Sequence, residues 1–392
     1  MDSIIADYKS KIRKFKESYP NVASTLYLTA LSIFIVASMI RNSQIIEIFS
    51  QKFIFILELI ATILVTTKIL FLDEHNWQEL SIFFLMEFYL YMSAYIAASV
   101  DIFYFSFFII GAKDVQVERI LKIFILTNIT FMIIAAILSL NGIIWNFTTT
   151  RSLYSPVCRY ALGMAYPTDY AARGLALLLA YAVLKKFRLR LPEYISFIAV
   201  ISWFYLITRT RIDLLLSLFL LVLIVIYPKV KQFFKKISVK TINIAMLVYM
   251  FGVYLIGFLY TCFPSNKILK LINSILSGRL THERTLFLNF PIRFTGRYIN
   301  QPGGGSGFFI DASFFRILWM YGTPMLLISI VLFFVLNNRF MKNLNYLPIE
   351  LAFIIFFISA GIDQHFLDAS FNFIPLLLFA NLKMFNKKEN SI

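Results

Sequence analysis

Residues 214–227 read LLLSLFLLVLIVIY, an apolar run in which polar and apolar positions do not alternate. The strands of a transmembrane barrel alternate with a period of two, so the run favours a helix and excludes such a barrel. Similar runs recur along the 392-residue chain, which is 59% hydrophobic and only 15% charged. Soluble globular domains carry about 25% charged residues. The composition therefore predicts an all-α polytopic membrane protein.

Most of the apolar segments are long enough to cross a bilayer about 30 Å thick. We expect single spans at 22–40, 53–72, 120–140, 171–184, 241–262, 313–336, 348–362 and 370–385. Two longer stretches, 80–112 and 194–227, contain polar residues near their middles, and we expect each to cross twice. The basic clusters of the intervening loops then share one side with the basic N-terminus, as the positive-inside rule requires. The prediction is a single membrane domain, 1–392, with about twelve spans and both termini cytoplasmic in the plasma (inner) membrane.

The extramembrane segments are unequal in length on the two sides. Residues 1–20 form a basic cytoplasmic tail, and no small-residue cleavage site follows the first apolar segment. The long connections are two outer loops, 141–170 and 263–311, so we expect any chemistry to face outside. A net charge of +16 indicates nucleic-acid binding in a soluble domain. Here the excess follows the membrane topology, so no nucleic-acid partner is predicted.

Arginine and lysine distribute differently across the expected topology. The outer side carries 11 Arg and 3 Lys, whereas the cytoplasmic side carries 5 Arg and 18 Lys. A topology signal needs only positive charge, but Arg also offers a planar fork that matches phosphate and carboxylate groups. The bias favours anion recognition at the outer face. The alternative is that these arginines pair with lipid headgroups or nearby acids.

The outer loop 263–311 holds most of the candidate site residues. They are Arg279, His282, Glu283, Arg284, Arg293, Arg297 and Asp311, followed by Arg316. Arg279 is expected to begin a short helix, because Leu280, Leu286 and Phe287 fall on one face. His282 or His365 would suit proton removal from a hydroxyl, with Glu283, Asp311, Asp363 and Asp368 as competing bases. An inert surface role is the alternative for either histidine.

Other features of the outer segments have two interpretations each. The run Gly303-Gly304-Gly305-Ser306-Gly307 either offers backbone N–H groups to an anion or serves as a flexible lid. Arg209 and Arg211 suit an anion at the outer turn, or Arg209 pairs with Asp213 four residues on. Trp145, Tyr154 and Tyr298 would stack on sugars or anchor the membrane interface. Cys158 and Cys262 stand alone, and no residue grouping has metal-ligand spacing, so neither a disulfide nor a metal is expected.

Four segments together resemble the polymerases of bacterial capsule, exopolysaccharide and O-antigen synthesis. Residues 159–168, RYALGMAYPT, resemble their R-x-x-x-G-x-x-x-P segment, with Arg159 and Tyr166 inside it. Thr208-Arg209-Thr210-Arg211 resembles their T-x-S-R turn, and Ser277-Gly278-Arg279 resembles an S-G-R in the large outer loop. Residues 311–322, DASFFRILWMYG, are similar to the D/H-x-x-Y/F-x-x-x-L-x-x-x-G that opens the following span. Order and topological side agree over most of the chain.

The resemblance implies a flippase-dependent repeat-unit polymerase with a membrane glycosyltransferase (GT-C-like) fold, related to the O-antigen ligases. Such enzymes transfer a growing glycan from undecaprenyl pyrophosphate to the next lipid-linked repeat unit, without a metal or other cofactor. Paired arginines would then stabilise the pyrophosphate leaving group, with Arg209, Arg211 and Arg279 as first choices and Arg159 and Arg316 as second. The base stays open among His282, Glu283 and Asp311, because Asp311 stands where many ligases have His or Asn.

The partners implied are lipid-linked oligosaccharides, membrane lipids, a chain-length regulator and a flippase. The same features leave three alternatives open. A ligase shares the donor but uses another acceptor, and a lipid-linked oligosaccharide flippase or other transporter also suits twelve spans. The third is a structural membrane protein without chemistry, which the outer arginine bias disfavours.

Overall fold

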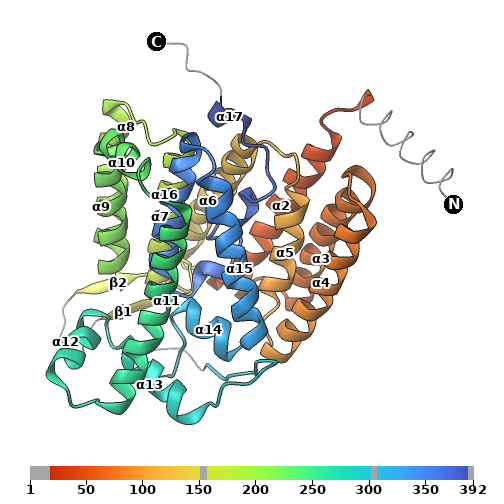
Figure 1. Cartoon of the computed structure of the whole chain (residues 1–392). Coiled ribbons are helices and arrows are strands. Elements are labelled where there is room, and N and C mark those ends of the chain that lie inside the picture. Colours follow the sequence, from red (N-terminus) through yellow and green to blue (C-terminus); the bar gives the residue numbers. More distant parts are fainter. Residues whose placement is uncertain (1–17, 151–156, 302–306, 387–392) are drawn as a thin grey trace. The chain divides into compact units, whose positions relative to one another are not determined.

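The computed structural model describes residues 18–150, 157–301 and 307–386 (Figure 1). These residues are almost entirely helical, apart from one antiparallel pair of strands, β1 Thr148–Thr150 and β2 Cys158–Tyr160. Seven of the described helices are long and apolar enough to cross a bilayer, and a bent pair would make an eighth. The sequence-based prediction of an all-helical, multi-pass membrane protein is confirmed at this level.

The described helices fall into two compact units, and the first comprises the described residues of 18–87, 103–217 and 373–386. Its helices are α2 Val22–Arg41, α3 Gln51–Thr67, α6 Val117–Leu140, α7 Pro167–Leu184, α8 Leu191–Thr208 and α17 Lys383–Asn386, with most of α5 Asp101–Gly111. α2 packs against α3 and α6, and α7 packs against α6 and α8. Proline stands in the first turn of α7 and α8, where its missing N–H leaves no helical hydrogen bond unmade.

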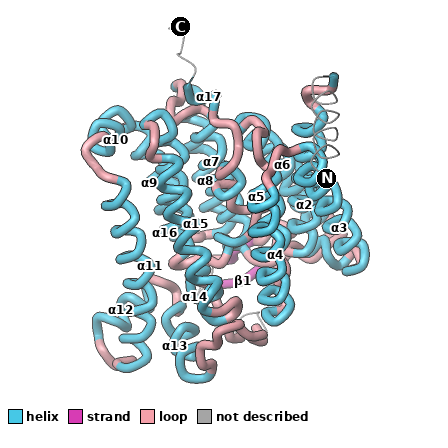
Figure 2. The backbone as a smooth tube through the Cα atoms, turned by 45° about the vertical axis from the view of Figure 1, so that its right-hand side comes forward, coloured by secondary structure: helices cyan, strands magenta, loops and turns pink. Residues whose placement is uncertain are grey.

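The second unit comprises residues 88–102 and 218–372. Its helices are α10 Tyr227–Phe234, α11 Val239–Cys262, α12 Lys267–Ile275, α13 Arg279–Asn289, α14 Ser313–Trp319, α15 Thr323–Phe340 and α16 Leu347–Ala360. α11 packs against α13 and α15, and α15 also packs against α14 and α16. In Figure 2, α12 and α13 are the two short helices that follow the end of α11.

The two long apolar stretches break where the sequence predicted. The first divides into α4 Trp77–Ala97 and α5, and the second into α8 and α9 Arg211–Val225. Arg209 closes α8 in the left-handed conformation, so the Arg209–Thr210 turn separates the two helices. α5 has 11 residues, fewer than the roughly 17–25 of an upright crossing. α9 bends by 83° into α10, which places the basic residues of α10 off the axis of the preceding helix.

Two expected spans differ from the structure. Residues 370–385 do not form a continuous helix; they hold a 3₁₀ turn at Pro375–Leu377 and the short α17. Nearly every side chain from 369 to 378 is buried within the protein, so this apolar run is core rather than a lipid-facing helix. The other expected span, 313–336, is interrupted between α14 and α15.

The interruption between α14 and α15 results from a close approach of two backbone segments. Gly322 has φ +92°, and a Cβ there would collide with the Phe294 carbonyl. Gly296, on the facing segment, has φ +74° and would collide likewise with the Met320 carbonyl. Because only glycine combines a positive φ with the absence of a side chain, this contact needs both glycines. It fixes the end of the segment 290–297 against the α14–α15 turn.

Candidate functional site

The start of α13 meets the segment before α14 at a pair of opposite charges in the second unit, Arg279 and Asp311. Arg279 is the first residue of the helix, as its sequence predicted, and its Nε lies 3.6 Å from Oδ2 of Asp311. The two side chains are 14% and 31% exposed, so the pair is reached from one side only. Within the described part of the chain, Arg279 Nε has no hydrogen-bond partner. The guanidinium therefore retains donor capacity beside the carboxylate.

Glu283 lies one turn after Arg279 on the same face of α13 and is 8% exposed. It inserts against α11 at Gly257, where a Cβ would stand 2.7 Å from Glu283 Oε2. The pKa of Glu283 is raised to about 8, chiefly by burial and also by the negative charge of Asp311, while the positive charge of Arg279 opposes the shift. Among the described residues, Oε2 has no hydrogen-bond partner. Glu283 is consequently a neutral acid at pH 7 and can donate a proton.

Asp311 is held beside Arg279 by the segment that precedes α14. Arg316 Nε donates to the Ile310 carbonyl at 2.8 Å, and Arg316 Nη2 donates to Gln301 Oε1 at 3.2 Å. Gln301 Oε1 also accepts from the Ile310 N–H at 3.0 Å, so one amide clamps both partners. The Arg316 guanidinium, predicted to bind substrate, is thus engaged with its own loop and also lies 5.0 Å from the Phe309 ring centroid.

The surroundings of Asp311 raise the pKa of its carboxyl group above the value in water. Burial raises the pKa of Asp311 above its usual value, the positive charge of Arg279 opposes this, and the negative charge of Asp363 adds to it. A carboxylate with a raised pKa is a stronger base than an exposed one. The arrangement therefore combines a carboxylate able to accept a proton with a guanidinium beside it.

A second acidic residue reaches this region through the loop that follows α16. Ser313 Oγ donates to the Asp363 carbonyl at 2.6 Å, and the Ser313 N–H donates to the same oxygen at 3.0 Å. Asp363 Oδ1 lies 3.4 Å from His365 Nε2, and the His365 ring stacks on Phe371 with 3.7 Å between centroids. The loop thus places the sequence candidates Asp363 and His365 close to Ser313, two residues after Asp311. Asp368 instead caps its own turn by accepting from the Ser370 N–H.

A recess of about 200 Å³, its open mouth included, joins these groups. It is lined by Arg279, His282, Glu283, Leu286, Phe309, Ile310 and Asp311. Polar side chains come from α13 and from the segment before α14, while Leu286 and Ile310 supply the apolar wall. The His282 ring also lies 6.3 Å from the Phe308 ring, centroid to centroid. The structure thus brings together four of the six predicted catalytic residues, namely Arg279, His282, Glu283 and Asp311.

The remaining arginines of the loop 263–311 lie outside this recess. Arg284 and Arg297 are half-buried and Arg293 is exposed. The Arg297 guanidinium lies 5.2 Å from the Phe290 ring centroid. Tyr298 is exposed as well, at 60%. These residues surround the loop without lining the recess.

The first unit carries the other predicted residues at the turn between α8 and α9. Arg159, from β2, donates through Nε to the Thr208 carbonyl at 2.7 Å. The Arg209 guanidinium lies 5.6 Å from the Tyr205 ring centroid, while Arg211 is exposed at the start of α9. The hydroxyls of Thr208 and Thr210 are 2.8 Å apart in the buried part of the turn. Arg159 and the arginine turn therefore form one structural group.

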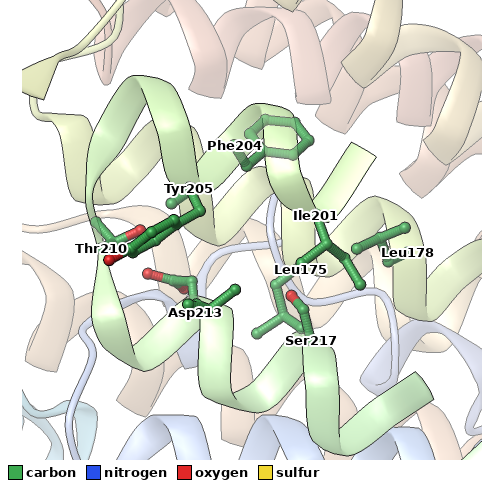
Figure 3. Close-up of a pocket in the computed structure, with 10 residues that line it drawn as sticks. Leu175, Leu178, Ile201, Phe204, Tyr205, Thr210, Asp213 and Ser217 are labelled. Carbon is green, nitrogen blue, oxygen red and sulfur yellow. The ribbon is translucent and has the colours of Figure 1, made fainter. Parts of the chain in front are cut away.

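A second recess, of about 230 Å³ with its mouth, lies below this turn. Figure 3 shows side chains from α7, α8 and the start of α9 around it, with the polar groups of Thr210, Asp213 and Ser217 among apolar ones. Tyr166 does not line it; its N–H donates to Asp169 Oδ2 at the start of α7, and its ring packs on Phe147. Tyr166 has a capping role in the structure.

Some predicted features lie outside the described residues, namely Tyr154, Gly303-Gly304-Gly305-Ser306 and most of the tail 1–20. Trp145 is 57% exposed, and Cys158 and Cys262 are both exposed free thiols. Across residues 18–150, 157–301 and 307–386, no three His, Cys, Asp or Glu side chains are placed to hold a metal ion.

Sequence reasoning missed the residues that hold the recess together. Gln301 and Gly257 lie in none of the four motif-like segments, and Ser313, inside the 311–322 segment, contacts Asp363, 50 residues away. The S-G-R and D-x-x-F segments pointed to Arg279 and Asp311 but not to the burial of Glu283. No protein-family model, curated protein or solved structure matches the chain.

Proposed function

We propose that this chain is a membrane glycosyltransferase that polymerises oligosaccharide repeat units. It transfers a growing glycan from undecaprenyl pyrophosphate onto the next lipid-linked repeat unit at the outer face of the plasma membrane. The proposal includes cytoplasmic termini and a GT-C-like arrangement of membrane-spanning helices, with fewer crossings than the twelve expected because residues 370–385 form core. The four motif-like segments, in order along an all-helical membrane chain, support it.

The observation that carries the proposal is the recess formed by α13 and the segment before α14. It combines Arg279 and Asp311, 3.6 Å apart, with the buried acid Glu283 and with His282. Glycosyl transfer to a hydroxyl needs a base for the acceptor and positive charge for the departing phosphate. Both kinds of group stand at this recess, on a connection that a membrane enzyme would expose to solvent.

Asp311, Arg279 and Glu283 have different parts in the proposed glycosyl transfer. The acceptor hydroxyl oxygen attacks the anomeric carbon, its proton passes to Asp311, and the bond from that carbon to the pyrophosphate oxygen breaks. The pyrophosphate leaves with the bonding electron pair, and the fork of Arg279 receives its developing charge. Glu283, neutral at pH 7, donates a hydrogen bond rather than competing for the acceptor proton. The base among the sequence candidates is then Asp311, whose pKa burial raises.

Arg209 and Arg211 keep their role as phosphate ligands in the proposal, with Arg159 supporting their turn through the Thr208 carbonyl. Arg211 is exposed at a helix start, where an anion also meets the free backbone N–H groups. The protein partners expected for such an enzyme are a flippase that delivers repeat units and a chain-length regulator.

Deleting the gene in its host and sizing the lipid-linked and surface glycans tests this proposal. Single repeat units accumulating outside, without long chains, support a polymerase. Long chains that are made but stay on the lipid indicate a ligase, and repeat units trapped inside indicate a flippase. Companion strains carry Arg279→Ala or, as a matched control, Arg188→Ala, an exposed arginine that lines neither recess. Normal chains from well-expressed Arg279→Ala would remove the site assignment even with the function intact.

A further inference from the structure

The helix α12, which reads KILKLINSI from Lys267 to Ile275, leaves an apolar face uncovered. Ile268, Leu271 and Ile275 are spaced i, i+3 and i+7, which places them on one side of a helix. Their side chains are 69%, 62% and 62% exposed, and no residue of α12 is buried. An apolar face that the protein does not cover needs another covering surface.

The orientation of α12 about its axis is set by Asn273. Its Nδ2 donates to the Tyr260 hydroxyl of α11 at 3.2 Å and to the Thr281 hydroxyl of α13 at 3.0 Å. Successive residues lie about 100° apart around a helix, so Leu271 projects about 160° away from Asn273. The hydrogen bonds therefore turn the Ile268–Leu271–Ile275 face away from α11 and α13.

The rest of the circumference is polar and exposed. Lys267, Lys270 and Ser274 occupy the sector that faces neither the protein nor the apolar side. Around its axis, α12 thus has a protein sector, an apolar sector and a charged sector. A helix that lies along a lipid–water boundary, beside the protein that anchors it, has this cross-section.

The bilayer is already within reach of α12. α11 is a candidate membrane span that ends at Cys262, four residues before α12 begins. Leu255 and Phe258 near that end are 55% and 49% exposed, and Phe263, the residue that follows α11, is 60% exposed. The lipid that covers these side chains is continuous with the surface on which α12 would rest. Lys267 and Lys270 suit anionic headgroups, to which long lysine side chains extend.

We propose that α12 is an interfacial helix that docks on the lipid headgroup region of the membrane in which α11 is embedded. Its apolar face enters the headgroup–acyl boundary by about 5–10 Å, as such helices do. Because Asn273 joins α12 to Thr281, this contact with lipid also steadies the start of α13, which carries Arg279. The inference depends on membrane insertion of the chain and not on its proposed catalytic function.

Depth-dependent quenching tests the proposal in the full-length protein. With Cys158 and Cys262 replaced by Ser, a single cysteine at Ile268→Cys or at Ser274→Cys carries an environment-sensitive fluorophore. The labelled proteins are reconstituted in vesicles of phosphatidylcholine with phosphatidylglycerol. The quenchers are a lipid with a nitroxide near its headgroup, and iodide on both sides of the membrane. Ile275→Cys replaces Ile268→Cys if the latter does not migrate as a single species in detergent.

The expected result is that the label at 268 is quenched by the lipid nitroxide and protected from iodide, whereas the label at 274 shows the reverse. Replacing Lys267 and Lys270 with Gln should reduce nitroxide quenching in the anionic vesicles and leave it unchanged in pure phosphatidylcholine. Equal iodide quenching at 268 and 274 would overturn the proposal. Emission at 268 that rises when unlabelled protein is mixed in would show that a second copy covers the face, and would overturn it as well.

Discussion

Glu283 provides the sharpest test of the recess, because burial is the largest cause of its raised pKa, ahead of the charges of Asp311 and Arg279. In the folded protein its pKa is about 8, whereas the ordinary pKa of a glutamate is 4.5. When folding raises the pKa of a carboxyl group, the stability of the protein is unaffected below the pKa of that group in the unfolded chain. Stability then falls as the pH rises toward the pKa of the group in the folded protein. The loss therefore falls between about pH 4.5 and 8.

The size of the loss follows from the two pKa values. At pH 7, keeping Glu283 neutral in the folded protein while it ionises in the unfolded chain costs about 3 kcal/mol. At about pH 5 the same linkage costs less than roughly 1 kcal/mol. Glu283→Gln keeps the shape and removes the titration. We expect this variant to be more stable than wild type, by a margin that grows from pH 5 to about pH 8.

Thermal unfolding of the purified protein in detergent, at one scan rate and at several pH values, measures this margin. Apparent midpoints suffice, because wild type and variant are compared under matched conditions. Glu118→Gln is the control, since Glu118 is 45% exposed and pairs with Lys122 at a helix surface. The difference in midpoint between the control and wild type should not change from pH 5 to 9. The same constant difference between Glu283→Gln and wild type would refute the assignment of Glu283 as a buried neutral acid.

Three further predictions concern the same unit. Arg279→Lys retains the positive charge but loses the planar guanidinium, so the rate of chain extension in proteoliposomes should fall about 10-fold. Arg279→Ala also loses the charge, and the rate should fall about 100-fold. Equal rates for both variants and wild type would contradict the role of Arg279. Asp311→Asn removes the proposed base and should lower the initial rate by about 10²–10⁴, with lipid-linked substrate still bound in a pull-down; a rate near wild type would exclude Asp311 as the base. Gly322→Ala should destabilise the protein by about 1–3 kcal/mol in the same unfolding assay. Gly142→Ala, at φ +70° but with open space around it, should destabilise the protein less. Equal destabilisation by both would show that backbone strain alone, and not the contact with residue 294, sets the penalty.

The position of the candidate site was partly predictable from the sequence. The start of α13 at Arg279 follows from the local pattern of Leu280 and Leu286, both of which are buried. The turn at Arg209–Thr210 also lies where polar residues interrupt the apolar run. Such features depend on neighbours in the chain, so periodicity and polarity reveal them.

Other parts of the site depend on residues far apart in the chain. Asp311 meets Arg279 across 32 positions, and Ser313 contacts Asp363 across 50. The sequence ranked Asp311, Glu283 and His282 equally as bases, because nothing local shows which carboxyl is buried. Gly257, on another helix, makes room for Glu283, and that burial separates its role from that of Asp311.

Hydrophobicity alone also misplaced one element. Residues 370–385 are as apolar as a membrane span, yet they fold as turns with nearly every side chain of 369–378 inside the protein. An apolar run indicates only that its side chains are removed from water, and either lipid or a protein core can surround them. The sequence by itself determined the helical, membrane-embedded class and the order of the charged segments along the chain. Only the tertiary structure decided which apolar runs become core and which carboxyl is neutral, because both depend on contacts between distant segments.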